Sequence, residues 1–375
     1  MHEPGRDERF MARALDLAVQ GLGRVEPNPM VGAVVVQGDR IVGEGYHARF
    51  GGPHAEVAAL GQAGENARGA ELFVSLEPCC HFGKTPPCTD AVLAAGVRRV
   101  VAAVADPFPE VAGRGIQILK DAGIETAVGV LQERARRLNG AFFKRVRTGL
   151  PLVIAKWAMT LDGRMATASG ESRWISSEES RRRVHEVRRV CDAVIIGAGT
   201  ALADEPSLTV RHVEPLPERG QPARVILDDR LALDAAREPA RSARETPVII
   251  YTTAESIAAL PDRTAALRSA GCELAAVPRA EGGVSPAAVV EDLGRRAMSR
   301  VMVEGGARIL GAFFGARLVD RVMIFVSPRI LGSAGAPGPV GGRDGLALAD
   351  ALQLMDITSE RVGPDILIQG RLGEF

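Results

Sequence analysis

The sequence predicts an α/β protein of two domains, and three observations lead to this prediction. The chain has 375 residues, more than a single typical hydrophobic core accommodates. Apolar strands alternate with helices along both halves, as expected where helices cover both faces of a largely parallel sheet. Leu150-Pro151 separates the halves, because proline cannot continue the preceding helix and a new apolar strand begins directly afterwards. We therefore expect domains at residues 1–150 and 151–375.

Periodicity and turn residues define the elements of the first half. Apolar side chains recur at helical spacing between residues 7 and 22, which predicts an amphipathic helix. Gly38-Asp39 lies between two apolar runs and predicts a β-hairpin of residues 31–36 and 41–46. Gly96 is expected to end a helix, because glycine readily adopts the left-handed C-terminal conformation. After the hairpin we expect a short helix opened by His54, a strand at 72–76, a helix at 89–95, a strand at 99–104, a helix ending near Gly123, a strand at 125–130 and a basic helix at 131–147.

The second half begins with a strand at residues 152–155 and continues the alternation. Residues 332–345 are rich in proline and glycine and are expected to form a long loop. Further apolar runs predict strands near residues 193–197, 223–228, 247–251, 300–303 and 321–326.

Charge and composition exclude several classes of protein. The 46 basic and 46 acidic residues balance, which argues against broad attraction to nucleic acid or to a membrane surface. No apolar run approaches the roughly 20 residues that span a bilayer, and the polar N-terminus is unlike a secretory signal. Three of the five cysteines lie between residues 79 and 88, which suits metal binding in a reducing compartment. We therefore expect a cytoplasmic enzyme that binds neither nucleic acid nor membranes.

One histidine and two cysteines form a candidate zinc site. His54, Cys79 and Cys88 supply one imidazole and two thiolates, the ligands of a catalytic zinc whose fourth position is open to water. Glu56 is then free to transfer protons. Zinc-dependent nucleobase deaminases use this arrangement, with a shorter gap between the two cysteines. The first half is therefore predicted to be a deaminase acting on a ring amine, with Glu56 as general base and then acid.

The alternative is a closed structural zinc site, in which His81 or Cys80 becomes the fourth ligand and no reaction occurs. Under this alternative the neighbouring glutamate has no role. Cys80 is expected to point away from the site, because the adjacent cysteine is already a ligand. Cys191 and Cys272 lie far from the cluster and are most simply buried apolar residues.

Three segments of the second half are compatible with binding a phosphate or a nucleotide. Gly197-Ala198-Gly199-Thr200 and Val303-Glu304-Gly305-Gly306 each follow a strand and precede a helix, where free N–H groups can bind an anion. Residues 169–174 combine a hydroxyl, an arginine and an aromatic surface. An ordinary tight connection is the alternative for each glycine-rich turn. No G-x-G-x-x-G sequence occurs at the first turn, so a Rossmann dinucleotide fingerprint is absent.

These segments resemble one family closely, the bifunctional riboflavin-biosynthesis deaminase–reductase. The long gap between Cys79 and Cys88, with His81, Gly83 and Lys84 inside it, is characteristic of this family within the wider deaminase superfamily. The resemblance covers nearly the whole chain. The matching segments are Pro27-Asn28-Pro29, Val31-Gly32, Gly43-Glu44-Gly45-Tyr46-His47, Pro53-His54-Ala55-Glu56, Leu76-Glu77-Pro78-Cys79, Thr85-Pro86-Pro87-Cys88, Val111-Ala112-Gly113-Arg114-Gly115, Lys156, Leu161-Asp162-Gly163-Arg164, Ser169-Gly170-Glu171-Ser172, Trp174-Ile175, Thr200, Leu202-Ala203-Asp204, Pro206, Leu208-Thr209, Arg211 and Glu304-Gly305-Gly306.

For the first domain, the resemblance implies a cytidine-deaminase-like, three-layer α/β/α fold. It also implies removal of the pyrimidine amine from 2,5-diamino-6-ribosylamino-4(3H)-pyrimidinone 5′-phosphate. The three zinc ligands and Glu56 keep the roles given above, and Lys84 becomes a partner for the substrate phosphate. The positions at which the family contacts substrate are Asn28, His47, His81 and Lys84.

Two positions of the first domain depart from the family pattern. Cys80 stands where the family usually has serine, and Phe108 replaces a usual asparagine. If that asparagine contacts substrate, this chain lacks one polar contact, which neighbouring residues must replace.

For residues 151–375, the resemblance implies a dihydrofolate-reductase-like fold and NADPH-dependent reduction of the ribosyl group to a ribityl chain. Arg211 can bind the substrate phosphate through two parallel hydrogen bonds. Either Asp204 or Lys156 can assist proton transfer. The residues implied to line the cofactor are Ala158, Trp174, Thr200, Asp204 and the loop starting at Gly306. Those implied to line the substrate are Ser172, Leu208, Arg211 and Glu304.

Two residues of this half leave alternatives open. Trp174 can form an apolar wall near the nicotinamide, or it can pack in the core. Asp229 falls where many relatives carry serine near the cofactor ribose. Its carboxylate would repel a 2′-phosphate, so NADH is an alternative to NADPH.

The leading hypothesis is a two-step enzyme that acts on a small phosphorylated pyrimidine, and we expect it to form a homo-oligomer. A second hypothesis assigns the deaminase to an adenosine in transfer RNA. The neutral net charge and the reductase-like second half oppose it, because RNA binding usually needs a basic face. A third treats the zinc as structural and the chain as a regulatory protein. The presence of Glu56 and Arg211 argues against the third.

Overall fold

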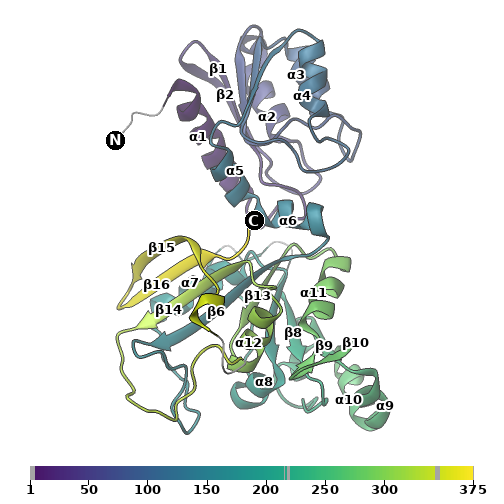
Figure 1. The fold of residues 1–375 in the computed structure, drawn as a ribbon. Helices are drawn as coiled ribbons and strands as arrows, with labels where there is room; N and C mark the ends of the chain where they lie inside the picture. Colours follow the sequence, from purple (N-terminus) through teal and green to yellow (C-terminus); the bar gives the residue numbers. More distant parts are fainter. Residues whose placement is uncertain (1–4, 215, 218–219, 343–346, 375) are drawn as a thin grey trace. The chain divides into compact units, whose positions relative to one another are not determined.

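The computed structural model describes residues 5–214, 216–217, 220–342 and 347–374. The chain divides into two compact units, one ending at Thr148 and the other beginning at Gly149. Each unit contains its own mixed β-sheet with helices packed on it (Figure 1), which confirms the predicted α/β class. Within the described ranges, no helix is long and apolar enough to cross a membrane.

The first unit is built on a five-stranded sheet with the order β2-β1-β3-β4-β5. β1 runs antiparallel to β2 and β3, whereas β3, β4 and β5 are parallel to one another. The antiparallel pair is the hairpin predicted from Gly38-Asp39, and Gly38 has the positive φ of 61° that such a turn requires. The strands are β1 (Gly32–Gln37), β2 (Arg40–Tyr46), β3 (Glu71–Val74), β4 (Arg99–Ala102) and β5 (Glu125–Val128).

Helices cover both faces of this sheet (Figure 1). α1 (Arg6–Ala18) packs on one face so closely that a Cβ at Gly32 would lie 2.0 Å from a backbone oxygen of the helix. α2 (Ala55–Ala63) packs on the other face, where a Cβ at Gly43 would lie 2.2 Å from a backbone oxygen of that helix. Side chains alternate along the paired strands, which puts these two glycines on opposite faces. The unit is therefore a three-layer α/β/α sandwich.

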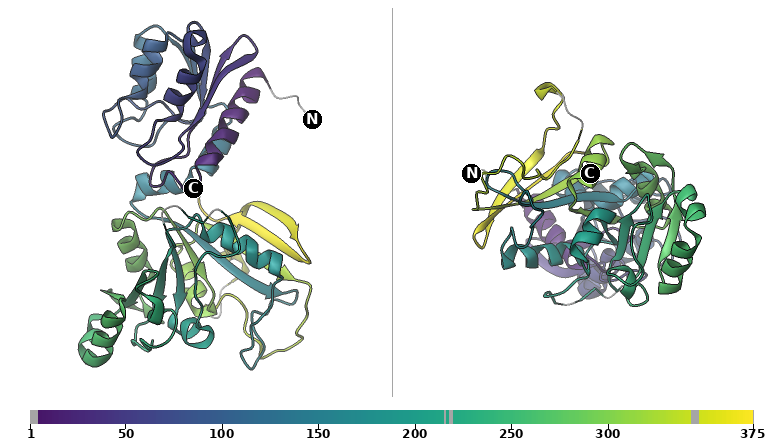
Figure 2. Two further views of the ribbon diagram at one scale, coloured as in Figure 1. Left: turned by 180° about the vertical axis from the view of Figure 1, so that it is seen from behind. Right: turned by 90° about the horizontal axis from the view of Figure 1, so that it is seen from below.

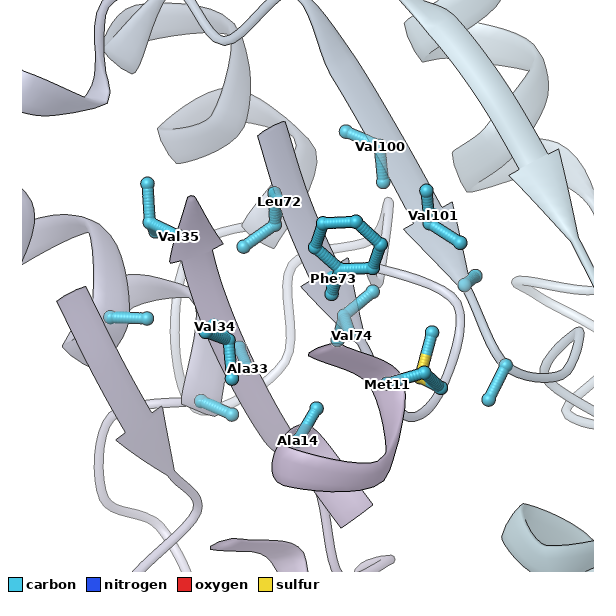
Figure 3. Close-up of a cluster of buried hydrophobic side chains, with 14 of the residues drawn as sticks. Met11, Ala14, Ala33, Val34, Val35, Leu72, Phe73, Val74, Val100 and Val101 are labelled. Atoms are coloured by element: carbon cyan, nitrogen blue, oxygen red, sulfur yellow. The ribbon is translucent and has the colours of Figure 1, made fainter. Parts of the chain in front are cut away.

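A hydrophobic core joins α1 to the strands. Figure 3 shows Met11 and Ala14 of α1 against side chains of β1, β3 and β4, including Phe73 and Val101. All four of these side chains are fully buried. The remaining elements on the sheet are α3 (Cys88–Ala95) and α4 (Arg114–Asp121), and α3 ends as predicted at Gly96, which has a left-handed φ of 67°. This packing fixes the strand and helix ends that carry the first site.

The basic helix expected over residues 131–147 is two helices, so this prediction was wrong. α5 (Gln132–Leu138) ends at Asn139, and α6 (Gly140–Thr148) begins directly after it. The buried Asn139 amide donates to the Met30 carbonyl and accepts from the Met30 N–H, both at 2.8 Å. This contact spans 109 residues of sequence and holds Asn139 outside helical geometry. The helical periodicity of the segment gave no sign of it.

The second unit contains a nine-stranded sheet with the order β10-β9-β8-β7-β13-β6-β14-β16-β15. The seven strands from β10 to β14 are parallel, and β16 and β15 add an antiparallel hairpin at one edge. Figure 2 shows this hairpin, in yellow, at the edge of the sheet. The strands are β6 (Leu152–Thr160), β7 (Ala193–Gly197), β8 (Ala223–Leu227), β9 (Val248–Thr252), β10 (Glu273–Ala276), β13 (Arg300–Glu304), β14 (Arg321–Ser327), β15 (Met355–Val362) and β16 (Asp365–Arg371).

Sequence patterns missed β10 and the hairpin of β15 and β16. β15 is exposed along almost its whole length, so it lacks the alternation of apolar and polar side chains that marks a half-buried strand. A separate two-stranded ribbon of β11 (Arg279–Ala280) and β12 (Gly283–Val284) was also not predicted. Residues 332–342 contain neither helix nor strand, as expected, and positions 343–345 of the expected loop lie outside the described residues.

The helices of the second unit are α7 (Glu178–Arg188), α8 (Ala198–Asp204), α9 (Ala254–Ala259), α10 (Pro261–Ala270), α11 (Pro286–Arg295) and α12 (Ala307–Gly315). Short 3-10 helices occupy Val19–Gly21, Gly64–Ala67, Ala240–Ser242 and Leu348–Asp350. Because β7, β8, β9 and β13 are parallel, the segments that follow them lie at one edge of the sheet, where open α/β sheets bind ligands.

Candidate active sites

The structure brings His54, Cys79 and Cys88 together, with their ligand atoms all within 4.8 Å of one another. His54 precedes α2, Cys88 is the first residue of α3, and Cys79 lies in the segment after β3. The Nδ1 atom of His54 is 3.1 Å from the Cys88 sulfur and 3.5 Å from the Cys79 sulfur. Ligand atoms around a tetrahedral zinc are about 3.4–3.8 Å apart. One nitrogen and two sulfurs gathered within 4.8 Å of one another are a donor set that fits zinc with a fourth position left open.

The surroundings of Cys79 favour its thiolate. The pKa of Cys79 falls to about 4, chiefly because the neighbouring Cys88 thiol donates a hydrogen bond to it. The imidazole of His54 and the N–H of Cys88 at the start of α3 also donate to the sulfur, the latter at 3.3 Å. A thiolate is the form in which cysteine binds a metal.

Glu56 lies in the first turn of α2 beside this cluster, and only 3% of its surface is exposed. Burial raises the pKa of its carboxyl to about 7. A carboxyl group with a pKa near neutrality can both accept and release a proton at that pH. The helix therefore holds His54 and Glu56 in fixed relation, one at its N-cap and one in its first turn.

Two of the predicted substrate contacts lie beside His54. The His47 ring donates from Nδ1 to the Pro53 carbonyl at 3.0 Å, and its Nε2 lies 3.4 Å from the Asn28 amide nitrogen. The rings of His47 and His54 meet edge to face with centroids 5.3 Å apart. His47 is 2% exposed, so its orientation is fixed by packing as well as by hydrogen bonds.

The other two predicted contacts lie in the long segment between the cysteines. His81 stacks near the Phe108 ring at 5.7 Å between centroids, and its Nδ1 is buried without a hydrogen-bond partner in the described structure. The Lys84 ammonium lies 3.9 Å from the centre of the Phe50 ring. Phe108, which departs from the family pattern, therefore contributes an aromatic surface beside His81.

Cys80 does not join the cluster. Its thiol points to the Glu110 carbonyl at 3.6 Å, and burial raises its pKa. Among the described residues, no fourth histidine, cysteine or carboxylate lies within 4.8 Å of all three ligand atoms. Neither Cys80 nor His81 is therefore a fourth ligand. Cys191 and Cys272 are buried, as expected.

Sequence analysis missed two residues that support this site. Thr85 Oγ1 lies 3.4 Å from His54 Nε2, where it can fix the orientation of the ring. The buried carboxylate of Glu77 accepts from the N–H groups of Asp106, Gly113 and Ile116 at 2.9–3.1 Å. It thereby ties the segment after β4 to the turn that carries the first cysteine. The position of Glu77 directly before Pro78-Cys79 was the one feature of the sequence that could have indicated this supporting role.

Replacement of Cys79 by serine is expected to remove bound zinc, because a hydroxyl does not supply the thiolate that the site offers. The matched change Cys80→Ser should leave one zinc per chain, since Cys80 contacts Glu110 instead of the cluster. Atomic absorption measures the zinc content of both variants and so shows which cysteine is a ligand. Loss of zinc from Cys80→Ser would contradict the three-ligand site.

A second cluster lies in the second unit, where a buried carboxylate is held by two cations. Glu304 ends β13 and accepts from Arg188 of α7 in two parallel hydrogen bonds of 2.5 and 2.8 Å. The Lys156 ammonium of β6 lies 3.8 Å from the same carboxylate, as the pairing of Lys156 with Glu304 in the sheet requires. Burial alone would raise the pKa of Glu304, but the two cations hold it at about 2. Burial lowers the pKa of Lys156.

Arg211 lies beside this cluster. Its guanidinium donates to the hydroxyls of Ser207 and Thr209, and burial followed by repulsion from Arg188 lowers its pKa. Its backbone N–H donates to His185 at 3.1 Å. Two neighbouring guanidiniums form a site suited to an anion. Leu208, between the two hydroxyl residues, adopts an unusual positive φ of 53°.

Sequence analysis missed Arg188 and His185, which lie on α7. Burial and the two nearby arginines lower the pKa of His185 to about 4. The imidazole is therefore neutral near pH 7, consistent with its role as acceptor for the Arg211 N–H. The sequence offered only a weak indication of their proximity: His185 and Arg188 are three residues apart and therefore lie on one face of the helix.

The predicted cofactor residues lie on several elements of the second unit. A Cβ at Gly306 would be 3.1 Å from the Thr200 hydroxyl, and Gly306 has a φ of 79°, so glycine keeps this approach open. Trp174 is 59% exposed, which excludes core packing, and Arg181 stacks on its ring at 4.4 Å. Asp204 faces Arg173 at 4.0 Å between the charged groups. Ala158 on β6 is half-buried, as is Ser172, which was predicted to line the substrate.

Comparison with known proteins gives two family matches. Residues 4–104 match the cytidine and deoxycytidylate deaminase zinc-binding region, and residues 151–368 match the RibD C-terminal domain. The riboflavin biosynthesis protein RibD of Aquifex aeolicus is 41% identical over 362 residues, covering 96% of this chain and 97% of the relative. That of Escherichia coli is 40% identical over 373 residues, covering 97% and 98%.

Two solved structures are similar over nearly their full length. The first, Acinetobacter baumannii RibD, has a TM-score of 0.84 at 36% identity, covering 98% of this chain and 99% of that one. The second is the diaminohydroxyphosphoribosylaminopyrimidine deaminase/5-amino-6-(5-phosphoribosylamino)uracil reductase of Thermotoga maritima. It has a TM-score of 0.83 at 37% identity, with the same coverage. The chain therefore belongs to the RibD family of riboflavin biosynthesis proteins.

Proposed function

We propose that the chain catalyses two consecutive steps of riboflavin biosynthesis. The first is zinc-dependent deamination of 2,5-diamino-6-ribosylamino-4(3H)-pyrimidinone 5′-phosphate by residues 1–150. The second is NADPH-dependent reduction of the ribosyl side chain by residues 151–375, which gives 5-amino-6-(5-phosphoribitylamino)uracil. The observation that carries the proposal is the three-donor cluster with the buried Glu56 carboxyl beside it.

In the deaminase step, His54, Cys79 and Cys88 would hold the zinc. Zinc bound by three protein ligands lowers the pKa of water in its fourth position and makes that water a nucleophile near neutral pH. Glu56 would take one proton from the attacking water and pass it to the ring nitrogen, and would then move the remaining hydroxyl proton to the departing ammonia. Asn28 and His47 present hydrogen-bonding groups beside the same cluster. Lys84 provides a cation for the substrate phosphate.

In the reductase step, the open approach between Gly306 and Thr200 fits a cofactor backbone, because a side chain at Gly306 would fill it. NADPH supplies a hydride to the ring-opened sugar carbon when it is bound. Arg211 binds the substrate phosphate, and Glu304 accepts from a sugar hydroxyl while Arg188 fixes its orientation. Lys156, beside Glu304, and Asp204, beside Arg173, are the two candidates for proton transfer.

We also propose that the protein is a cytoplasmic homo-oligomer. Clustered thiols that bind a metal are typical of a reducing compartment. β15 is an edge strand, and Ile357 on it is 62% exposed. Such an edge is a template for pairing with a second chain. The molar mass in solution, measured by light scattering, tests this; a monomeric mass contradicts it.

Removal of zinc tests the proposed division of labour. Treatment with a chelator is expected to abolish ammonia release from the diaminopyrimidine phosphate, because the one metal-ligating group found among the described residues lies in the first site. NADPH oxidation with deaminated substrate should persist, and added zinc should restore ammonia release. Both activities are measured on the same preparation. Equal loss of the two would contradict a metal-free second site, and loss of neither would contradict catalysis by zinc.

A further inference from the structure

We propose that Arg279, which pairs with Asp229 and offsets its negative charge, contacts the cofactor 2′-phosphate and makes this chain select NADPH over NADH. The inference rests on the proposed reductase function and names the residues that decide its coenzyme. It resolves a conflict in the sequence, where Asp229 by itself would repel a phosphate.

The first step concerns the position of Asp229 in the sheet. β7, α8 and β8 form a strand–helix–strand unit whose two strands are adjacent and parallel. α8 begins directly after β7 and carries Thr200 in its first turn, and Asp228-Asp229 follows β8 at the same edge of the sheet. In Rossmann units, which have the same strand–helix–strand connection but a glycine fingerprint that this chain lacks, a carboxylate after the second strand binds the ribose 2′-hydroxyl of NAD. An arginine near that position accommodates the 2′-phosphate of NADP instead.

The structure distinguishes between the two adjacent carboxylates. Asp228 is 1% exposed and accepts from the N–H groups of Ala232 and Leu233 at 3.0 and 2.9 Å, so it holds the following turn. Asp229 is partly exposed, and its carboxylate accepts from Arg279 at 2.6 Å. Only the second of these carboxylates is placed to influence a ligand.

Arg279 lies on β11 of the two-stranded ribbon, and 53% of its side chain is exposed. The bond to Asp229 uses one terminal nitrogen, Nη1, and the half-exposed guanidinium has further N–H groups that can donate to a ligand. A second arginine, Arg308 of α12, donates to the Gly282 carbonyl of the same ribbon at 3.1 Å. Arginine is the residue best suited to bind phosphate through several N–H groups.

The charges around Arg279 predict which cofactor is weakened when the arginine is removed. Besides Asp229, the carboxylate of Glu255 at the start of α9 is attracted by the positive charge of Arg279. Removal of the arginine therefore removes a phosphate contact and also leaves two carboxylates uncompensated. Both changes disfavour a 2′-phosphate, and neither affects a cofactor with a 2′-hydroxyl to the same extent.

Binding of two nucleotide probes tests the inference without relying on turnover. We expect Arg279→Ala to raise the Kd of 2′,5′-ADP by about 10–100-fold, the range for a lost charge-assisted contact. The Kd of 5′-ADP, which lacks the 2′-phosphate, should change less than about threefold, within what an exposed ion pair contributes. Isothermal titration calorimetry on the full chain gives both values, and NADPH and NADH should follow the same order. Arg279→Lys should recover part of the loss, because it restores the positive charge.

Two controls separate this role from a structural one. Arg183→Ala breaks other exposed ion pairs, with Glu360 at 2.8 Å and with Glu186 at 3.2 Å, and should leave both probes unchanged. Asp229→Ser should tighten 2′,5′-ADP and leave 5′-ADP unchanged. Equal weakening of both probes by Arg279→Ala, or no weakening of either, overturns the inference. A wild-type chain that binds neither NADPH nor NADH while releasing ammonia normally overturns the reductase function and the inference with it.

Discussion

Replacement of Glu56 by glutamine is expected to slow ammonia release by about 10²–10⁴-fold, the usual contribution of a positioned acid–base group. Glutamine keeps the shape of the side chain but cannot carry the proton. Because Glu56 is not among the three donors of the metal group, zinc should remain bound at the wild-type level. The reductase activity on deaminated substrate should be unchanged.

Ammonia release and zinc content are measured on the same preparation of Glu56→Gln. Glu65→Gln is a suitable control, since Glu65 is an exposed glutamate that follows the same helix. It should retain full activity. Substantial deamination by Glu56→Gln would refute the proton-transfer role. Loss of zinc would mean that the carboxylate supports the metal site and not the proton transfer alone.

Replacement of Arg188 by methionine is expected to lower the free energy of unfolding of the second unit by about 3–5 kcal/mol. Removal of one partner from a buried ion pair leaves the other charge without compensation. The side chains of Arg188 and Glu304 are only 11% and 10% exposed, and Lys156 lies farther from the carboxylate, at 3.8 Å. Reduction should also be lost, because Glu304 is no longer oriented.

Tryptophan fluorescence measures this loss selectively. Both tryptophans of the chain, Trp157 and Trp174, lie in the second unit, so urea unfolding followed by their emission reports on that unit. Arg183→Met, which breaks an exposed pair, should cost no more than about 1 kcal/mol. Adding Glu304→Gln to Arg188→Met should recover part of the stability, because the uncompensated anion is removed. A change below about 1 kcal/mol in Arg188→Met would contradict the account.

Local patterns were sufficient for much of the fold. The hairpin around Gly38-Asp39 and the end of α3 at Gly96 depend on turn residues, whose conformational preferences act over a few positions. The prediction of a single helix over residues 131–147 was wrong, because the break between α5 and α6 depends on the distant contact between Asn139 and Met30. The strand β15 was missed because an exposed edge strand carries no alternating pattern.

The chemical character of the first site was determined by the sequence alone, since the types of donor at positions 54, 79 and 88 already imply zinc. Membership of the family, suggested by the same motifs, is established by the comparisons. Only the tertiary structure decided which charges meet. Arg188 reaches Glu304 across 116 residues, and Arg279 reaches Asp229 across 50. A charge on an isolated segment has no fixed partner until packing brings another element against it, and packing is a property of the whole chain.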